Sequence, residues 1–161
     1  MKLRSDAWLL LGLSSLPGEL SLSSGWLSYV ASGCGSVWPA QLRKLERQVG
    51  QPGLAEALEQ NQRTLVIRWP VLEVRAWCPW YYFGGGMKLR HQGTQLRLSF
   101  GVPGNMVLRG HRAGPAGALG KATAQLREVG VMRRRGKLWH DAIVEQNRRA
   151  ATAAADDPPL R

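Results

Sequence analysis

The hydrophobic pattern of residues 64–100 constrains the fold of this chain more than any other feature. Within 72–77, three apolar residues alternate with Glu73, Arg75 and Trp77. The stretch 64–83 is also rich in β-branched and aromatic residues, which suit the pleated surface of a sheet. Because strict alternation places one set of side chains on each face, this pattern predicts strands with one buried face.

Turn sequences divide this region into short strands. Gln92 and Gly93 separate two alternating stretches, and 102–105 leads into a further strand at 106–109. In the stretch after Gly93, Leu96, Leu98 and Phe100 are expected to face inward. Consecutive strands joined by short turns usually pair antiparallel. The sequence therefore predicts an α+β fold, with an antiparallel meander of about four strands (residues 64–109) flanked by N-terminal and C-terminal helices.

Helices are predicted where apolar residues recur every three or four positions. The clearest begins at Pro39 and places Leu42, Leu45 and Val49 on one side. Further helices are expected at 5–13, 54–62, 115–129 and 138–155. Three segments are interpreted as non-helical: a break at 16–20, a short buried piece at 26–31 and a link at 130–137.

The size and composition of the chain favour one compact domain. The 161 residues are 44% hydrophobic and 20% charged, a balance that is typical of globular proteins. Two separate domains of half this length would each bury little of their surface. We therefore expect a single α+β domain over residues 1–155 and a flexible tail at 156–161.

The positive charge is the strongest indication of function, and it is unevenly distributed. The formal net charge is +11 and the isoelectric point is about 10.8. Residues 1–83 hold 8 Lys and Arg against 6 Asp and Glu, whereas residues 84–161 hold 14 against 5. Such a field attracts polyanions. The expected partners are the phosphate backbone of a nucleic acid or an acidic protein surface.

One candidate phosphate site is the glycine-rich segment 110–126. It differs from a nucleotide-binding P-loop, because Pro115 replaces the first glycine and Ala122 replaces the hydroxyl residue that would hold magnesium. A helix that starts there would still present unpaired N–H groups to an anion. Lys121 and Arg112 are therefore predicted to contact phosphate, although a plain loop and helix cap is the simpler interpretation.

The densest basic run lies at 132–137, where the predicted phosphate contacts are Arg133, Arg134, Arg135 and Lys137. A solvated linker is the alternative interpretation of this run. Arg97, on an outward strand face, is a further predicted contact. Trp77 is expected to be partly exposed and able to stack on a base. The aromatic segment from Trp77 to Phe83 could otherwise fill the core or join copies of the chain in a homo-oligomer.

The sequence does not favour catalysis, a metal site or a cofactor. The three histidines and two cysteines lack the spacing of zinc ligands, and carboxylates are scarce. Cys34 and Cys78 are expected to be reduced and mostly buried. The apolar run near the start is short for a signal peptide, and no run approaches the ~20 residues of a membrane span. We therefore expect a cytoplasmic protein without a membrane span.

Together these features predict a non-catalytic, basic nucleic-acid-binding domain, either RNA-binding or DNA-binding, that contacts the phosphate backbone through its C-terminal half. The alternative is a structural subunit of a larger assembly, such as a virion component or another multiprotein complex. In that case the same basic and aromatic surfaces would dock on protein.

Overall fold

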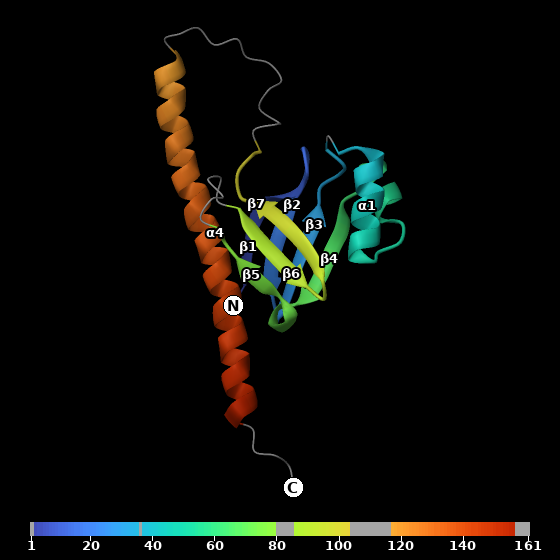
Figure 1. The fold of residues 1–161 in the computed structure, drawn as a ribbon, viewed down its shortest axis with the longest axis vertical. Helices are drawn as coiled ribbons and strands as arrows, with labels where there is room; N and C mark the ends of the chain where they lie inside the picture. The colour runs from blue at the N-terminus through green and yellow to red at the C-terminus, as the bar shows by residue number, and fades with distance from the viewer. Residues whose placement is uncertain (1, 36, 80–85, 104–116, 157–161) are drawn as a thin grey trace.

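The computed structural model describes residues 2–35, 37–79, 86–103 and 117–156. Its strands form one seven-stranded sheet in which every neighbouring pair is antiparallel. The strands are β1 (Leu3–Leu11), β2 (Ser14–Ser23), β3 (Trp26–Ala31), β4 (Thr64–Pro70), β5 (Arg75–Trp77), β6 (Met87–His91) and β7 (Thr94–Ser99). The helices are α1 (Pro39–Val49), α2 (Leu54–Glu59), the short 3-10 helix η1 (Val71–Glu73) and α4 (Gly117–Asp156). Figure 1 shows α1 and α4 on opposite sides of the sheet.

The sheet curls so that its two edges approach each other. The strand order is β4-β3-β2-β1-β7-β6-β5, which places β4 and β5 at opposite edges although only η1 separates them in the chain. The ring of Trp69 on β4 stacks on the ring of His91 on β6, with centroids 4.9 Å apart. The strands thus enclose an inner face, as the right-handed twist of strands favours.

The core lies on this inner face and under the helices. Leu9 of β1 pairs in register with Leu16 of β2 and Leu98 of β7, and all three are buried. Helix α1 begins with Pro39 at its first turn, ends at Gly50 with φ 67°, and buries Leu42 and Leu45. The predicted helix at 39–49 is confirmed, and α2 occupies the first part of the predicted 54–62 helix.

The prediction of an N-terminal helix at 5–13 is wrong, because this segment forms the central strand β1. Ala7 and Leu9 face the core, whereas Trp8 and Leu10 lie half-buried on the outer face. Apolar residues on both faces hide the alternation that identifies a strand from sequence.

The predicted break at 16–20 is also wrong, because Pro17 lies within β2. The register between β2 and β3 begins only at Gly18, so Pro17 stands beyond the last pair on that side. Its carbonyl accepts a hydrogen bond from Ser32 N at 2.9 Å. A proline is therefore tolerated in this strand. The short buried segment at 26–31 is strand β3.

The meander prediction is partly confirmed. The β6–β7 hairpin forms as expected, with Gln92 and Gly93 both at positive φ (45° and 84°), and Leu96, Leu98 and Phe100 are buried. Strands β4 and β5 do not pair with each other, and three earlier strands complete the sheet. The α+β class therefore holds, whereas a four-stranded sheet flanked by terminal helices does not. The predicted strand at 106–109 lies outside the described residues.

The two C-terminal helices and their link form one continuous helix, α4, of 40 residues. At 1.5 Å per residue it is about 60 Å long, and both of its ends extend beyond the sheet in Figure 1. The glycines that suggested a link lie inside it: Gly136 is buried against Cys78, whose Sγ lies 3.4 Å from the Gly136 carbonyl oxygen. No helix within the described ranges is long and apolar enough to cross a membrane.

Candidate nucleic-acid interface

Four cations lie side by side on the outer face of strands β5, β6 and β7. Arg75 on β5 is directly opposite Arg90 on β6, and Lys88 on β6 is directly opposite Arg97 on β7. Each pair belongs to a row of opposite residues across the three strands. One row is Arg75, Arg90 and Gln95, and the other is Trp77, Lys88 and Arg97. We call these four cations the basic face: Arg75, Lys88, Arg90 and Arg97.

The basic face contains no carboxylate at any of these register positions. Directly opposite side chains in a sheet are about 5 Å apart, and like charges there are destabilising. The outward acids of the sheet lie elsewhere: Asp6 and Glu19 are opposite each other on β1 and β2, and Glu19 forms ion pairs with Arg4 and Arg63. One further carboxylate lies at the hairpin end of the basic face: Glu73 Oε2 is 2.9 Å from His91 Nε2 and accepts a hydrogen bond from Gln92 Nε2 at 3.0 Å.

Trp77 provides an aromatic edge to the basic face. It is half-buried, and the Lys88 ammonium lies 5.8 Å from its ring centroid. Such a contact holds the lysine stem along the ring. The expectation that Trp77 is partly exposed is confirmed; whether it stacks on a base stays a prediction.

Replacing Arg90 by glutamine should raise the free energy of unfolding by about 0.2–1 kcal/mol, because it relieves the repulsion from Arg75. The gain should shrink as salt is added, since exposed charges are screened. The control is Arg68→Gln, which removes a guanidinium 4.9 Å from the Trp26 ring and should not stabilise the fold. Denaturant titrations at low and high salt measure both changes, and an Arg90→Gln variant less stable than wild type contradicts the prediction.

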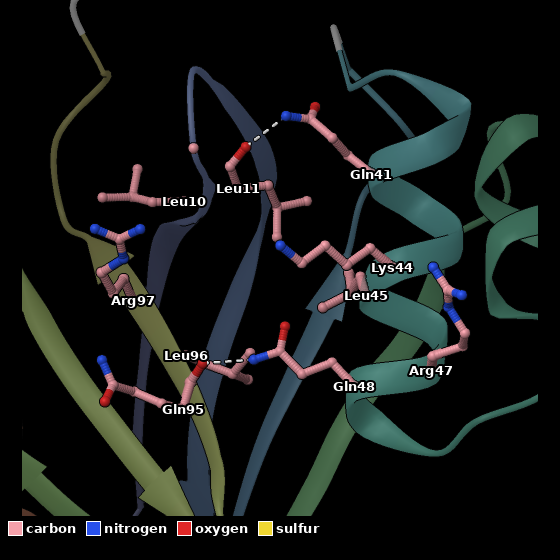
Figure 2. Close-up of a pocket in the computed structure, with 11 residues that line it drawn as sticks. Leu10, Leu11, Gln41, Lys44, Leu45, Arg47, Gln48, Gln95, Leu96 and Arg97 are labelled. Atoms are coloured by element: carbon pink, nitrogen blue, oxygen red, sulfur yellow. Dashed lines mark hydrogen bonds between the residues drawn. The ribbon is translucent and has the colours of Figure 1, made fainter.

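A groove of about 700 Å³ lies between α1 and the ends of β1 and β7. Its apolar lining comes from Leu10, Leu11, Leu45 and Leu96, and its polar lining from Gln41, Lys44, Arg47, Gln48, Gln95 and Arg97. Figure 2 shows Lys44 reaching from α1 toward the strands, Arg97 beside Leu10 on the side of the strands away from α1, and Arg47 pointing away from the strands. Among the residues that the structure describes, no carboxylate lines this groove.

The groove and the basic face form one positive surface. Gln95 and Arg97 line the groove, and the same two residues end the cross-strand rows of the basic face. Two glutamines fix α1 against the strands: Gln41 Nε2 donates to Leu11 O at 2.8 Å, and Gln48 Nε2 donates to Gln95 O at 2.7 Å. The groove wall is therefore held in place without a ligand.

The predicted cluster on α4 is exposed but does not form one face. Arg133, Arg134, Arg135 and Lys137 are all exposed. Consecutive residues of an α-helix are about 100° apart around its axis, so the three arginine side chains point in different directions. Gly136 and Asn147 contact the two residues that flank β5: the Gly136 carbonyl lies 3.4 Å from Cys78 Sγ, and Asn147 Nδ2 donates to Val74 O at 3.2 Å. Helix α4 therefore lies along the edge of β5, which brings this part of the helix next to the strand that carries Arg75.

Cys78 lies at this contact between β5 and α4. The residue as a whole is exposed, but its sulfur is turned toward the helix. Partial burial, followed by the negative charge of Asp141, raises the pKa of the Cys78 thiol. Cys34 is half-buried, and both cysteines are free. The expectation of reduced cysteines agrees with this structure, whereas Cys78 is less buried than expected.

The other predicted contacts are only partly described. Lys121 belongs to the first part of α4, where the backbone is helical but side chains are not described, and Arg112 lies outside the described residues. Sequence reasoning missed three neighbours of Arg97 as site residues: Arg75, Lys88 and Arg90. The same alternation that pointed to Arg97 places all three on the outer face, but their adjacency depends on the register between strands.

Among the described residues, no group of three or more His, Cys, Asp or Glu side chains could hold a metal ion. No protein-family model matches the chain, and neither a curated protein nor a solved structure matches it. The molecule is thus characterised by its fold and surface: an α+β protein with a curled antiparallel sheet whose last three strands carry a cationic outer face.

Proposed function

We propose that this protein is a non-catalytic nucleic-acid-binding protein that contacts the phosphate backbone through the basic face. The observation that carries the proposal is the placement of cations directly opposite one another on neighbouring strands, Arg75 opposite Arg90 and Lys88 opposite Arg97. This arrangement costs stability in the free protein. A row of phosphates would remove the repulsion and gain charge-assisted hydrogen bonds.

The shape of the basic face suits a polymer better than a single small anion. Its cations are spread over three neighbouring strands, about 4.8 Å apart from strand to strand, and Arg75, Arg90 and Arg97 are exposed. Guanidinium groups bind phosphate oxygens in a bidentate manner. The exposed cations of α4 could extend the contact beyond β5, as secondary contacts to the same backbone.

The test is a triple variant, Arg75→Gln with Arg90→Gln and Arg97→Gln. Each phosphate contact contributes about 0.7 to the slope of log K against log salt for single strands and 0.9 for B-DNA. Loss of three contacts should flatten the slope by about 2–3 and weaken binding about 50-fold near physiological salt. Fluorescence anisotropy with labelled single-stranded and duplex oligonucleotides over a salt series measures both quantities.

The matched control removes the same charge elsewhere. Arg43→Gln, Arg63→Gln and Arg68→Gln replace three exposed arginines on α1, before β4 and on β4. Both triple variants lower the net charge by three. They differ in the position of the lost charge, and the control also loses the ion pair of Arg63 with Glu19 and the contact of Arg68 with the Trp26 ring. Equal weakening by the two variants, or unchanged binding by the basic-face variant, would reject the basic face as the binding surface. Oligonucleotides recovered intact after incubation with Mg²⁺ would agree with a non-catalytic role.

The alternative, a structural subunit of a larger assembly, has its own support in α4. Val131 and Leu138 are 42% and 53% exposed on this long helix, close to its arginines. Exposed apolar side chains on a projecting helix suit docking on protein. Size-exclusion chromatography with light scattering separates the two proposals, because a stable higher oligomer that lacks nucleic-acid absorbance favours the assembly subunit.

A further inference from the structure

The groove beside the basic face has features that a phosphate backbone alone does not require. It joins the basic face through Gln95 and Arg97, and Lys44 stands on the opposite wall. Half-buried Leu10 and Leu11 give the groove accessible apolar surface, whereas Leu45 and Leu96 are 1% and 3% exposed and form its floor. Binding of phosphates alone does not require an apolar recess between the cations.

The groove also presents an oriented hydrogen-bond acceptor. The Gln48 amide nitrogen donates to the Gln95 carbonyl, which fixes the side chain so that its Oε1 faces away from that bond. In Figure 2 this oxygen points toward the side of the groove where Lys44 lies. The Gln48 backbone carbonyl accepts a second bond from Thr94 Oγ1 at 3.0 Å, so two bonds tie the end of α1 to the β6–β7 hairpin.

We infer that the groove takes an unpaired base of a single-stranded nucleic acid, while Lys44 and Arg97 bind the phosphates on either side of it. This inference rests on the proposed function. The Watson–Crick edge of every base carries at least one N–H donor, and in a duplex that donor is already paired. A paired adenine or cytosine keeps one exocyclic N–H free in the major groove, but its faces are stacked on neighbouring bases. Only an unpaired base can therefore offer both its Watson–Crick edge to Gln48 Oε1 and a free face to the leucines.

The size of the groove agrees with this occupant. A volume of about 700 Å³ lies in the range of pockets that hold small organic molecules, and it leaves space for a base with its sugar. The described part of the lining contains no aromatic ring, so the base would be held there by apolar contact and hydrogen bonding rather than by stacking on a ring.

The experiment compares two labelled single strands of about 12 nucleotides, a length within the range of single-strand binding sites. One carries bases, and the other has the same phosphates with abasic sites throughout. Wild-type protein should bind the base-bearing strand about 5- to 10-fold more tightly, since one hydrogen bond and the apolar contacts are lost with the base. Gln48→Met should reduce this ratio to about 2-fold or less and leave the affinity for the abasic strand unchanged.

Gln62→Met is the matched control, because it also removes an exposed amide that donates a hydrogen bond, to Gln60 Oε1 at 2.7 Å, and Gln62 does not line the groove. It should keep the wild-type ratio. A wild-type protein that binds both strands equally, or a Gln48→Met variant that keeps the full ratio, would overturn the groove assignment while leaving phosphate binding intact. Absence of binding to either strand would instead reject the proposed function and this inference together.

Discussion

Replacing Trp139 with alanine is expected to lower the free energy of unfolding by about 3–5 kcal/mol, the range for large aromatic residues in a core. Trp139 packs α4 against the core of the sheet, together with Ile143 one turn later. Its side chain is 1% exposed, and its ring stacks on Phe100 with centroids 6.2 Å apart and an interplanar angle of 14°. Its indole N–H also donates to Ser5 Oγ at 2.7 Å. Alanine leaves a cavity and an unpaired Ser5 hydroxyl.

Urea titration followed by circular dichroism measures this loss. The control is Leu138→Ala, one position away on the same helix, where the side chain is 53% exposed and the change should stay within about 0.5 kcal/mol. Trp139→Phe should lie between the two, because it keeps part of the packing and loses the bond to Ser5. If Trp139→Ala were as stable as Leu138→Ala, α4 would not be docked through this side chain.

The parts of the fold that could be predicted are those whose signals are local. The β6–β7 hairpin is determined by alternation on both sides of a Gln-Gly turn, and α1 by its periodic leucines and its terminal Pro39 and Gly50. Strand β1 could not be identified in this way, because it pairs on one side with β7, about ninety positions later, and carries apolar residues on both faces. In a central strand with apolar residues on both faces, polar and apolar residues do not alternate, so the two-residue period of a strand cannot be recognised.

The same distinction applies to the candidate site. Arg97 and Trp77 could be assigned to outward strand faces from alternation, but the direct opposition of Lys88 with Arg97 depends on a register that no local pattern determines. For the run at 132–137 the local pattern predicted a link between two helices, but the run lies inside α4. Glycine weakens a helix, yet Gly136 is where α4 packs closely against Cys78, so a tertiary contact overrides the local preference.

Gly18→Ala is expected to destabilise the protein by about 3 kcal/mol, at the upper end for overpacking a filled core. A Cβ at position 18 would lie 2.7 Å from the ring of Tyr29 and would press on the Val30 carbonyl. The Tyr29 ring cannot easily give way, because its hydroxyl donates to Leu16 O at 2.6 Å and accepts from Leu9 N at 3.3 Å. Burial also raises the pKa of this hydroxyl, so it stays protonated and keeps its donor role at neutral pH.

The control is a second glycine, Gly130, where the same substitution is expected to raise the free energy of unfolding instead of lowering it. Around Gly130 in α4, a Cβ would meet no heavy atom of the described residues within 4 Å. Gly130→Ala should therefore stabilise the protein by about 0.5–1 kcal/mol, the usual gain for alanine in a helix. Thermal and urea unfolding of both variants should give shifts in opposite directions. If Gly18→Ala were neutral, the close approach of Tyr29 to β2 would be incorrect, and with it the register that places Pro17 and Gly18 inside the sheet.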